Sequence, residues 1–250
     1  MASTQHRTPS EWAQLQTGQG LAYRFLGRCF YEAPDAEWIA TLAEERLFEA
    51  WPFPSKDEDT TEGLSLLRDF CESWDTTKLG ELQWDFTRLF VGPGKMLVPP
   101  WESVHRSKTG LTFQESTLRV REIYQGFGVE ASAIHREPDD HIGIELAFVG
   151  RLSELAAAAA TEGDTATLDR HLEAQKAFLR DHLLVWAPRC LELVGEHAET
   201  AYYHGVARLT LGTLSESATL CEARADPADE DQPGLARSSD VRQDGEEHVP

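Results

Sequence analysis

Apolar side chains recur at intervals of three and four residues along most of this chain, and this spacing constrains the fold more than any other feature. Two successive segments show it most plainly, with apolar residues at Leu64, Leu67, Cys71 and Trp74 and then at Leu79, Leu82, Phe86 and Leu89. An α-helix places residues with this spacing on one face. No segment alternates polar and apolar residues for long enough to predict a strand. The sequence therefore predicts an all-α helical bundle of about nine to ten helices in two packed halves.

Short polar residues and prolines predict where helices begin and end. Three residues precede an apolar repeat and carry side chains that accept hydrogen bonds from the first backbone N–H groups of a helix: Ser10, Asp35 and Asp164. Pro188 suits the first turn of a helix over 189–197, because a proline there loses no intrahelical hydrogen bond. A last helix is expected over 200–217.

The chain of 250 residues is long enough to bury one sizeable core without disulfides or metal. From Glu222 onward the sequence has nine acids, three arginines and almost no large apolar residue, so this segment is predicted to be disordered. The expected boundaries are 1–9 for a flexible lead, 10–218 for one all-helical domain, about 10–128 and 138–218 for its halves, 129–137 for their connector and 219–250 for the acidic tail.

The formal net charge of −20 favours cationic partners. Phosphate backbones and anionic lipids would be repelled, so neither nucleic acid nor a membrane is an expected partner. The charge equally fits solubility in a high-salt cytoplasm, since only five of the 23 basic residues are lysine. The four cysteines are far apart and are interpreted as reduced thiols, and neither a signal segment nor a membrane span is recognisable. A cytoplasmic protein is therefore predicted.

Two unusual segments stand out near the middle of the chain. Residues 92–104 read GPGKMLVPPWESV, which is too rich in proline and glycine for a helix interior. Residues 137–146 read EPDDHIGIEL, where three acids and a histidine open an expected helix. We name them the Pro-Trp loop and the Asp-His turn, expect them to face one surface, and place the function there rather than at a catalytic centre.

The residue types at this surface fit a peptide-binding groove. Proline, tryptophan and other apolar side chains would form its wall, and carboxylates at its rim would pair with guanidinium groups, with Ser103 and His141 orienting those carboxylates. A peptide with arginines at one end and apolar residues at the other matches this arrangement. The predicted peptide-binding residues are Leu89, Phe90, Pro99, Pro100, Trp101, Glu102, Ser103, Glu137, Asp139, Asp140 and His141.

The same residues have other interpretations. Trp101 could pin the loop to the core, and Asp139 or Asp140 could cap the helix that begins here. Asp140 and His141 could form an acid–base dyad oriented by Glu102. Since no phosphate loop, nucleophile elbow or zinc motif is present, we predict no catalytic residue, metal or cofactor. An acid–base or metal-dependent hydrolase and an acidic assembly scaffold remain the alternative functions.

Three motifs read W-x-x-x-x-L-F-x-G-P over 84–93, P-P-W-E-S-V over 99–104 and E-P-D-D-H-I-G-I-E-L over 137–146. Together they resemble the signature of the TorD/DmsD family of cytoplasmic redox-enzyme maturation chaperones, and the resemblance spans roughly 21–214. It implies a non-enzymatic chaperone that binds the twin-arginine signal peptide of a molybdenum-cofactor oxidoreductase of the DMSO or TMAO reductase type, and assists cofactor insertion before export. The binding elements that it implies are Leu89, Phe90, Pro100, Trp101, Glu102, Asp140 and His141.

The resemblance leaves several points open. The mature domain of the client is a further possible partner, and either a monomer or a domain-swapped homodimer is compatible with it. His105 stands where the family pattern leads us to expect an aromatic residue such as tyrosine, which would alter the groove or make it sensitive to pH. The acidic tail has no counterpart in the pattern, and no phosphate loop supports nucleotide binding.

Overall fold

The computed structural model describes residues 7–92, 94, 96–107, 110–129 and 137–223, and within them the regular elements are all helices. The only β contact among these residues is a single bridge between Trp101 and His141. The all-α prediction is confirmed. The elements are α1 (Pro9–Tyr31), α2 (Ala36–Glu44), η1 (Leu47–Glu49), α3 (Glu58–Glu72), η2 (Thr76–Lys78), α4 (Leu79–Phe86), η3 (Thr87–Val91), α5 (Glu102–Arg106), α6 (Glu115–Gly126), α7 (Ile142–Glu162), α8 (Thr165–Phe178), η4 (Leu179–Leu183), α9 (Leu184–His197) and α10 (Ala201–Ala223).

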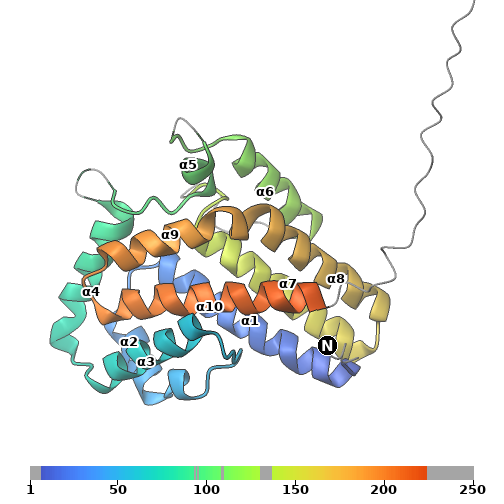
Figure 1. Ribbon diagram of the computed structural model, residues 1–250, viewed down its shortest axis with the longest axis horizontal. Helices are drawn as coiled ribbons and strands as arrows, with labels where there is room; N and C mark the ends of the chain where they lie inside the picture. The colour runs from blue at the N-terminus through green and yellow to red at the C-terminus, as the bar shows by residue number, and fades with distance from the viewer. Residues whose placement is uncertain (1–6, 93, 95, 108–109, 130–136, 224–250) are drawn as a thin grey trace, which may run out of the picture.

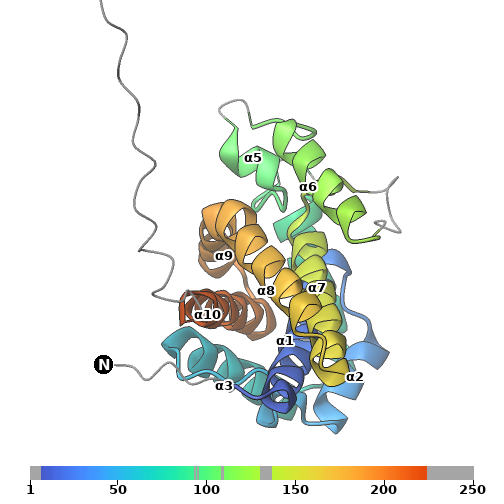
Figure 2. The same cartoon turned by 90° about the vertical axis from the view of Figure 1, so that its right-hand side faces the viewer.

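Most of the helices pack around one large core, and a smaller apolar cluster joins α7, α8 and the start of α1. Figures 1 and 2 show α1 and α7 side by side, α10 between α3 and α9, and α5 with α6 at one edge. Buried residues from early and late helices meet in that core, for example Leu26 of α1 and Leu146 of α7. The two predicted halves therefore pack on each other, while their division at 129–137 stays a prediction because 130–136 lie outside the described residues.

Glycines let α1 and α7 approach until their backbones touch. A Cβ atom added to Gly143 would lie 2.7 Å from the carbonyl oxygen of Gly27 and 2.9 Å from Cβ of Tyr31. Further along the same helix pair, Gly20 faces Gly150. A Cβ atom added to either of these glycines would lie 3.2 to 3.3 Å from the carbonyl oxygen of the other. The numbers rise along one helix as they fall along the other, so the two helices run antiparallel. Gly143 belongs to the Asp-His turn motif, and this contact holds that motif against α1.

The predicted helix boundaries are partly confirmed. Asp35 and Asp164 do cap α2 and α8, accepting hydrogen bonds from Trp38 N–H and Thr167 N–H. Ser10 as the first cap is wrong, because Thr8 and Glu11 exchange hydrogen bonds in a capping box two residues earlier.

Pro188 in a first turn is also wrong, since α9 continues directly from the π-helical turn η4 and contains Pro188 in its interior. A proline one turn inside a helix removes one backbone hydrogen bond, and the irregular turn before it accommodates that loss.

The remaining predictions concern the two ends of the chain. α10 continues to Ala223, past the predicted domain boundary at 218. Most of the predicted lead and of the predicted disordered tail lie outside the described residues. None of the helices within the described ranges combines the length and apolar content needed to cross a bilayer.

Candidate functional site

The Pro-Trp loop and the Asp-His turn lie against each other. Glu102 N–H donates to the Asp140 carbonyl at 2.9 Å, and Ile142 N–H donates to the Pro100 carbonyl at 2.8 Å. A side-chain bond adds to this pair, because Ser103 N–H donates to Asp140 Oδ2 at 2.7 Å. The prediction that the two segments meet is therefore confirmed, and we call their contact the junction.

The predicted acidic rim is not exposed. Glu102 and Asp140 have no exposed surface, and Asp139 is 2 % exposed. Each is engaged inside the protein: Asp139 by Arg121 at 2.7 Å, Asp140 by the Ser103 amide, and Glu102 by Arg106 and His182. A rim of free carboxylates at these three positions is therefore wrong, because their partners come from α5, α6 and η4. These acids hold the junction together.

His141, rather than an aspartate, caps α7. Its Nδ1 accepts the Gly143 N–H at 3.0 Å, so the capping predicted for Asp139 or Asp140 is wrong. Burial lowers the pKa of His141 to about 3, which keeps the imidazole neutral at physiological pH. A neutral, buried cap bonded to a backbone amide is a structural histidine.

Replacing His141 with asparagine should make the protein less sensitive to acid. The folded pKa is about 3 and the unfolded value about 6.5, so between these values the unfolded chain binds more protons and stability falls as pH falls. Relative to the variant, the wild type should lose up to about 1.4 kcal/mol per pH unit in this window. Asparagine keeps a capping oxygen. Urea unfolding from pH 7.5 to 4.5 measures the effect, and equal pH dependence for both proteins would contradict it.

Aromatic rings surround His141 at the surface of the junction. Trp101 lies edge-on to it at 6.1 Å between ring centroids, and Tyr31 does so from α1 at 5.4 Å. Tyr31, Pro99, Trp101 and Glu137 are each half-buried, so part of each reaches solvent. Sequence reasoning missed Tyr31, since nothing in its local pattern links the end of α1 to a turn more than a hundred residues later.

Three predicted wall residues lie beneath this surface. Leu89, Phe90 and Pro100 are buried, and Val98 N–H donates to the Leu89 carbonyl at 2.9 Å, which ties the loop to η3. Leu89 and Phe90 belong to the main core cluster. These residues support the loop from below, and the half-buried residues above them are the ones that a ligand could reach.

A buried polar network extends from the junction to α9. His182 Nδ1 lies 2.9 Å from Glu102 Oε2, and Trp186 Nε1 donates to Glu145 Oε2 at 3.1 Å. Burial raises the pKa of Glu145 well above its usual value, and the nearby Glu102 raises it further. Burial also acts to raise the pKa of Glu102, but hydrogen bonds from His182 and Arg106 outweigh it and lower that pKa.

His105 takes the place of the expected aromatic residue without becoming a charged group. Its Nε2 donates to the Pro99 carbonyl at 2.7 Å, and its ring lies 5.2 Å from that of Trp186. Burial lowers its pKa, so it is neutral at physiological pH. His105 therefore fixes the Pro-Trp loop by packing and one hydrogen bond.

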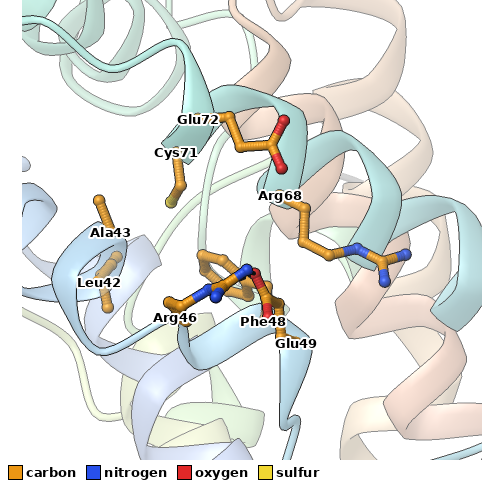
Figure 3. A pocket seen from close by; sticks show the side chains of 8 residues that line it. All are labelled: Leu42, Ala43, Arg46, Phe48, Glu49, Arg68, Cys71 and Glu72. Carbon is orange, nitrogen blue, oxygen red and sulfur yellow. Dashed lines mark hydrogen bonds and ion pairs between the residues drawn. The ribbon is translucent and has the colours of Figure 1, made fainter.

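The four cysteines do not form a reactive centre. All four are free thiols in this structure. Cys71 points into a small pocket between α2, η1 and α3, beside Leu42 and Phe48 (Figure 3). Burial raises its pKa to about 11, so this thiol is protonated and a poor nucleophile at neutral pH. In the part of the chain that the structure describes, no three His, Cys, Asp or Glu residues are grouped so as to hold a metal ion.

The chain matches one family model and is similar to several known proteins. Residues 54–192, more than half of it, match the family model described as nitrate reductase delta subunit. The chain belongs to this family. It is 29% identical over 195 residues to the Tat proofreading chaperone DmsD of Salmonella typhi, covering 77% of this chain and 85% of the relative. It is 32% identical over 136 residues to the chaperone protein TorD of Vibrio cholerae, covering 54% of this chain and 60% of the relative.

One solved structure is similar at a coarser level. It is a putative redox enzyme maturation protein from Archaeoglobus fulgidus, 19% identical, with a TM-score of 0.45 over 77% of this chain and 92% of the other. The curated relatives confirm the resemblance to the TorD/DmsD family. Because they are named chaperones and not enzymes, the chaperone role predicted from the motifs is supported and the hydrolase alternative is not.

Proposed function

We propose that this protein is a cytoplasmic chaperone that binds the twin-arginine leader of a molybdenum-cofactor oxidoreductase precursor and retains the precursor until its cofactor is in place. The leader seats on the junction. The observation that carries this proposal is the direct contact between the Pro-Trp loop and the Asp-His turn, with a partly open aromatic surface above it. The client's mature domain is a further partner, and the chaperone acts as a monomer or a swapped dimer.

The geometry changes the binding mechanism that the motifs suggested. The buried acids hold the two segments together, and the leader would contact the half-buried residues Tyr31, Pro99, Trp101 and Glu137 instead. Trp101 and Tyr31 would cover the apolar part of the leader, and Glu137 would pair with an arginine. Burying a few large side chains at about 25 cal/mol per Å², less the cost of ordering the peptide, corresponds to roughly micromolar affinity.

Two unused acceptors strengthen this assignment. Within the described residues, Ser103 Oγ and Asp140 Oδ1 are buried without a hydrogen-bond partner. Such atoms are costly to leave unpaired, and a bound polar group would satisfy them.

Calorimetry with two synthetic leader peptides tests the proposal. The peptide comes from a molybdenum-cofactor oxidoreductase of the same organism, with its Arg-Arg pair intact or replaced by Gln-Gln. We expect roughly micromolar binding for the first and at least about tenfold weaker binding for the second, because a buried or half-buried charge pair contributes more than about 1.4 kcal/mol. Equal affinities would remove the charge-pairing step, and no binding of either peptide would overturn the function.

A further inference from the structure

A groove lies along the C-terminal part of α9, and it shares no residue with the junction. It runs over α10 between α3 and α9, which flank α10 in Figures 1 and 2. Its floor is apolar, formed by Leu66, Leu191, Ala207 and Leu211. Leu66 and Leu211 are only partly buried, so the floor is open to solvent.

One wall of this groove is kept bare by Gly195. A Cβ atom added there would meet nothing within 4 Å, whereas one added to Gly205 on the neighbouring helix would lie 2.7 Å from Leu67 Cγ. Gly205 is thus required by helix packing, and Gly195 is not. A glycine inside a helix costs roughly 1 kcal/mol relative to alanine. Gly195 therefore leaves open space on this side of the groove.

The rim of the groove carries three exposed glutamates, in contrast to the buried acids of the junction, and Arg208 and His204 also line the groove. Glu62, Glu192 and Glu196 line it with side chains 48 %, 57 % and 52 % exposed. Their counter-ions, Arg208 and Arg189, are about half exposed as well, at N–O distances of 3.0 to 3.5 Å. Exposed ion pairs of this kind contribute little and exchange readily. A cationic partner could therefore displace them, helped by the net charge of −20.

We propose that this groove binds a cationic amphipathic helix of the client polypeptide, outside the twin-arginine leader. Leucine-like side chains repeating at three- and four-residue intervals would lie on the floor, and flanking lysines or arginines would meet the three carboxylates. The client as partner rests on the proposed function. The groove gives the chaperone a second contact with the precursor, and simultaneous use of two sites raises the overall affinity.

A glycine pair provides a matched test. The probe is a fluorescein-labelled 16-residue helical peptide of leucine and lysine with one apolar face, measured by anisotropy. Gly195→Gln fills the groove and should weaken binding at least tenfold. Gly80→Gln is the control, because Gly80 is also helical, exposed and free of neighbours within 4 Å, and it should bind like the wild type. A peptide of the same composition in scrambled order should bind wild type at least tenfold more weakly.

Two outcomes would overturn the inference: equal affinity of wild type and Gly195→Gln for the helical probe, or equal affinity of wild type for the helical and scrambled probes. The second outcome would mean attraction by net charge alone. Titrating the twin-arginine leader into Gly195→Gln separates this inference from the proposed function. We expect Gly195→Gln to bind the leader as the wild type does. That result would support the proposed function even if the groove bound no helix.

Discussion

Replacing Gly143 with alanine is expected to lower the free energy of unfolding by about 3 kcal/mol, which corresponds to a fall in Tm of about 6 to 12 °C for a chain of this size. The added Cβ would lie 2.7 Å from the Gly27 carbonyl oxygen and 2.9 Å from Cβ of Tyr31. Neither atom is the end of a flexible side chain, so α1 and α7 must move apart. That movement would loosen core contacts on both sides of the helix pair.

Gly195→Ala is the control for this substitution. It makes the same chemical change in a helix, but nothing lies within 4 Å of the new atom. Better helix propensity should stabilise the protein by up to about 1 kcal/mol. Urea unfolding followed by circular dichroism measures both variants. A Gly143→Ala protein as stable as the wild type would mean that the two helices are not in backbone contact.

Replacing Glu102 with alanine should cost about 3 kcal/mol at pH 7, because it leaves His182 and Arg106 without their shared carboxylate. Glu102 has no exposed surface. The matched control is Glu115→Ala: Glu115 also pairs with an arginine four residues later, but its side chain is 77% exposed, so its loss should change stability little.

The effect of Glu102→Ala should depend on pH in a defined direction. The pKa of Glu102 is lowered in the folded state, so its contribution is present above the unfolded pKa of about 4.5 and is lost as pH falls through the lowered folded value. The difference in unfolding free energy between wild type and Glu102→Ala should therefore shrink in acid. A difference that stays constant from pH 7 to pH 3 would show that cavity formation, rather than the ion pair, dominates.

Local patterns predicted the helices well because the information for a helix lies within it. The spacing of Leu64, Leu67 and Cys71 fixed one face of α3, and Asp35 and Asp164 capped their helices as expected. The junction was predicted from the resemblance of three motifs. Its adjacency is real, but neither periodicity nor composition would have shown it.

What the sequence could not provide was the environment of each charged side chain. Asp139 and Asp140 were interpreted as caps or rim charges because a helix follows them. Their actual partners, Arg121 and the Ser103 amide, are 18 and 37 residues away in sequence. A buried carboxylate accepts hydrogen bonds from donors that would otherwise be unpaired in the protein interior. Tertiary packing determines which donors these are. The same limit hid Tyr31, which reaches the junction from the far end of α1.

The central claim is that the leader seats on the junction, and the indole N–H signal of Trp101 tests it most directly. Because the chain has only seven tryptophans, a two-dimensional ¹H–¹⁵N spectrum contains few indole N–H peaks. The peak that disappears in Trp101→Phe is the one from Trp101. With a saturating twin-arginine leader peptide, we expect the Trp101 peak to shift while that of Trp186, which is buried against Glu145, stays in place or moves less. A Trp101 peak that does not move while the peptide binds with micromolar affinity would contradict the account.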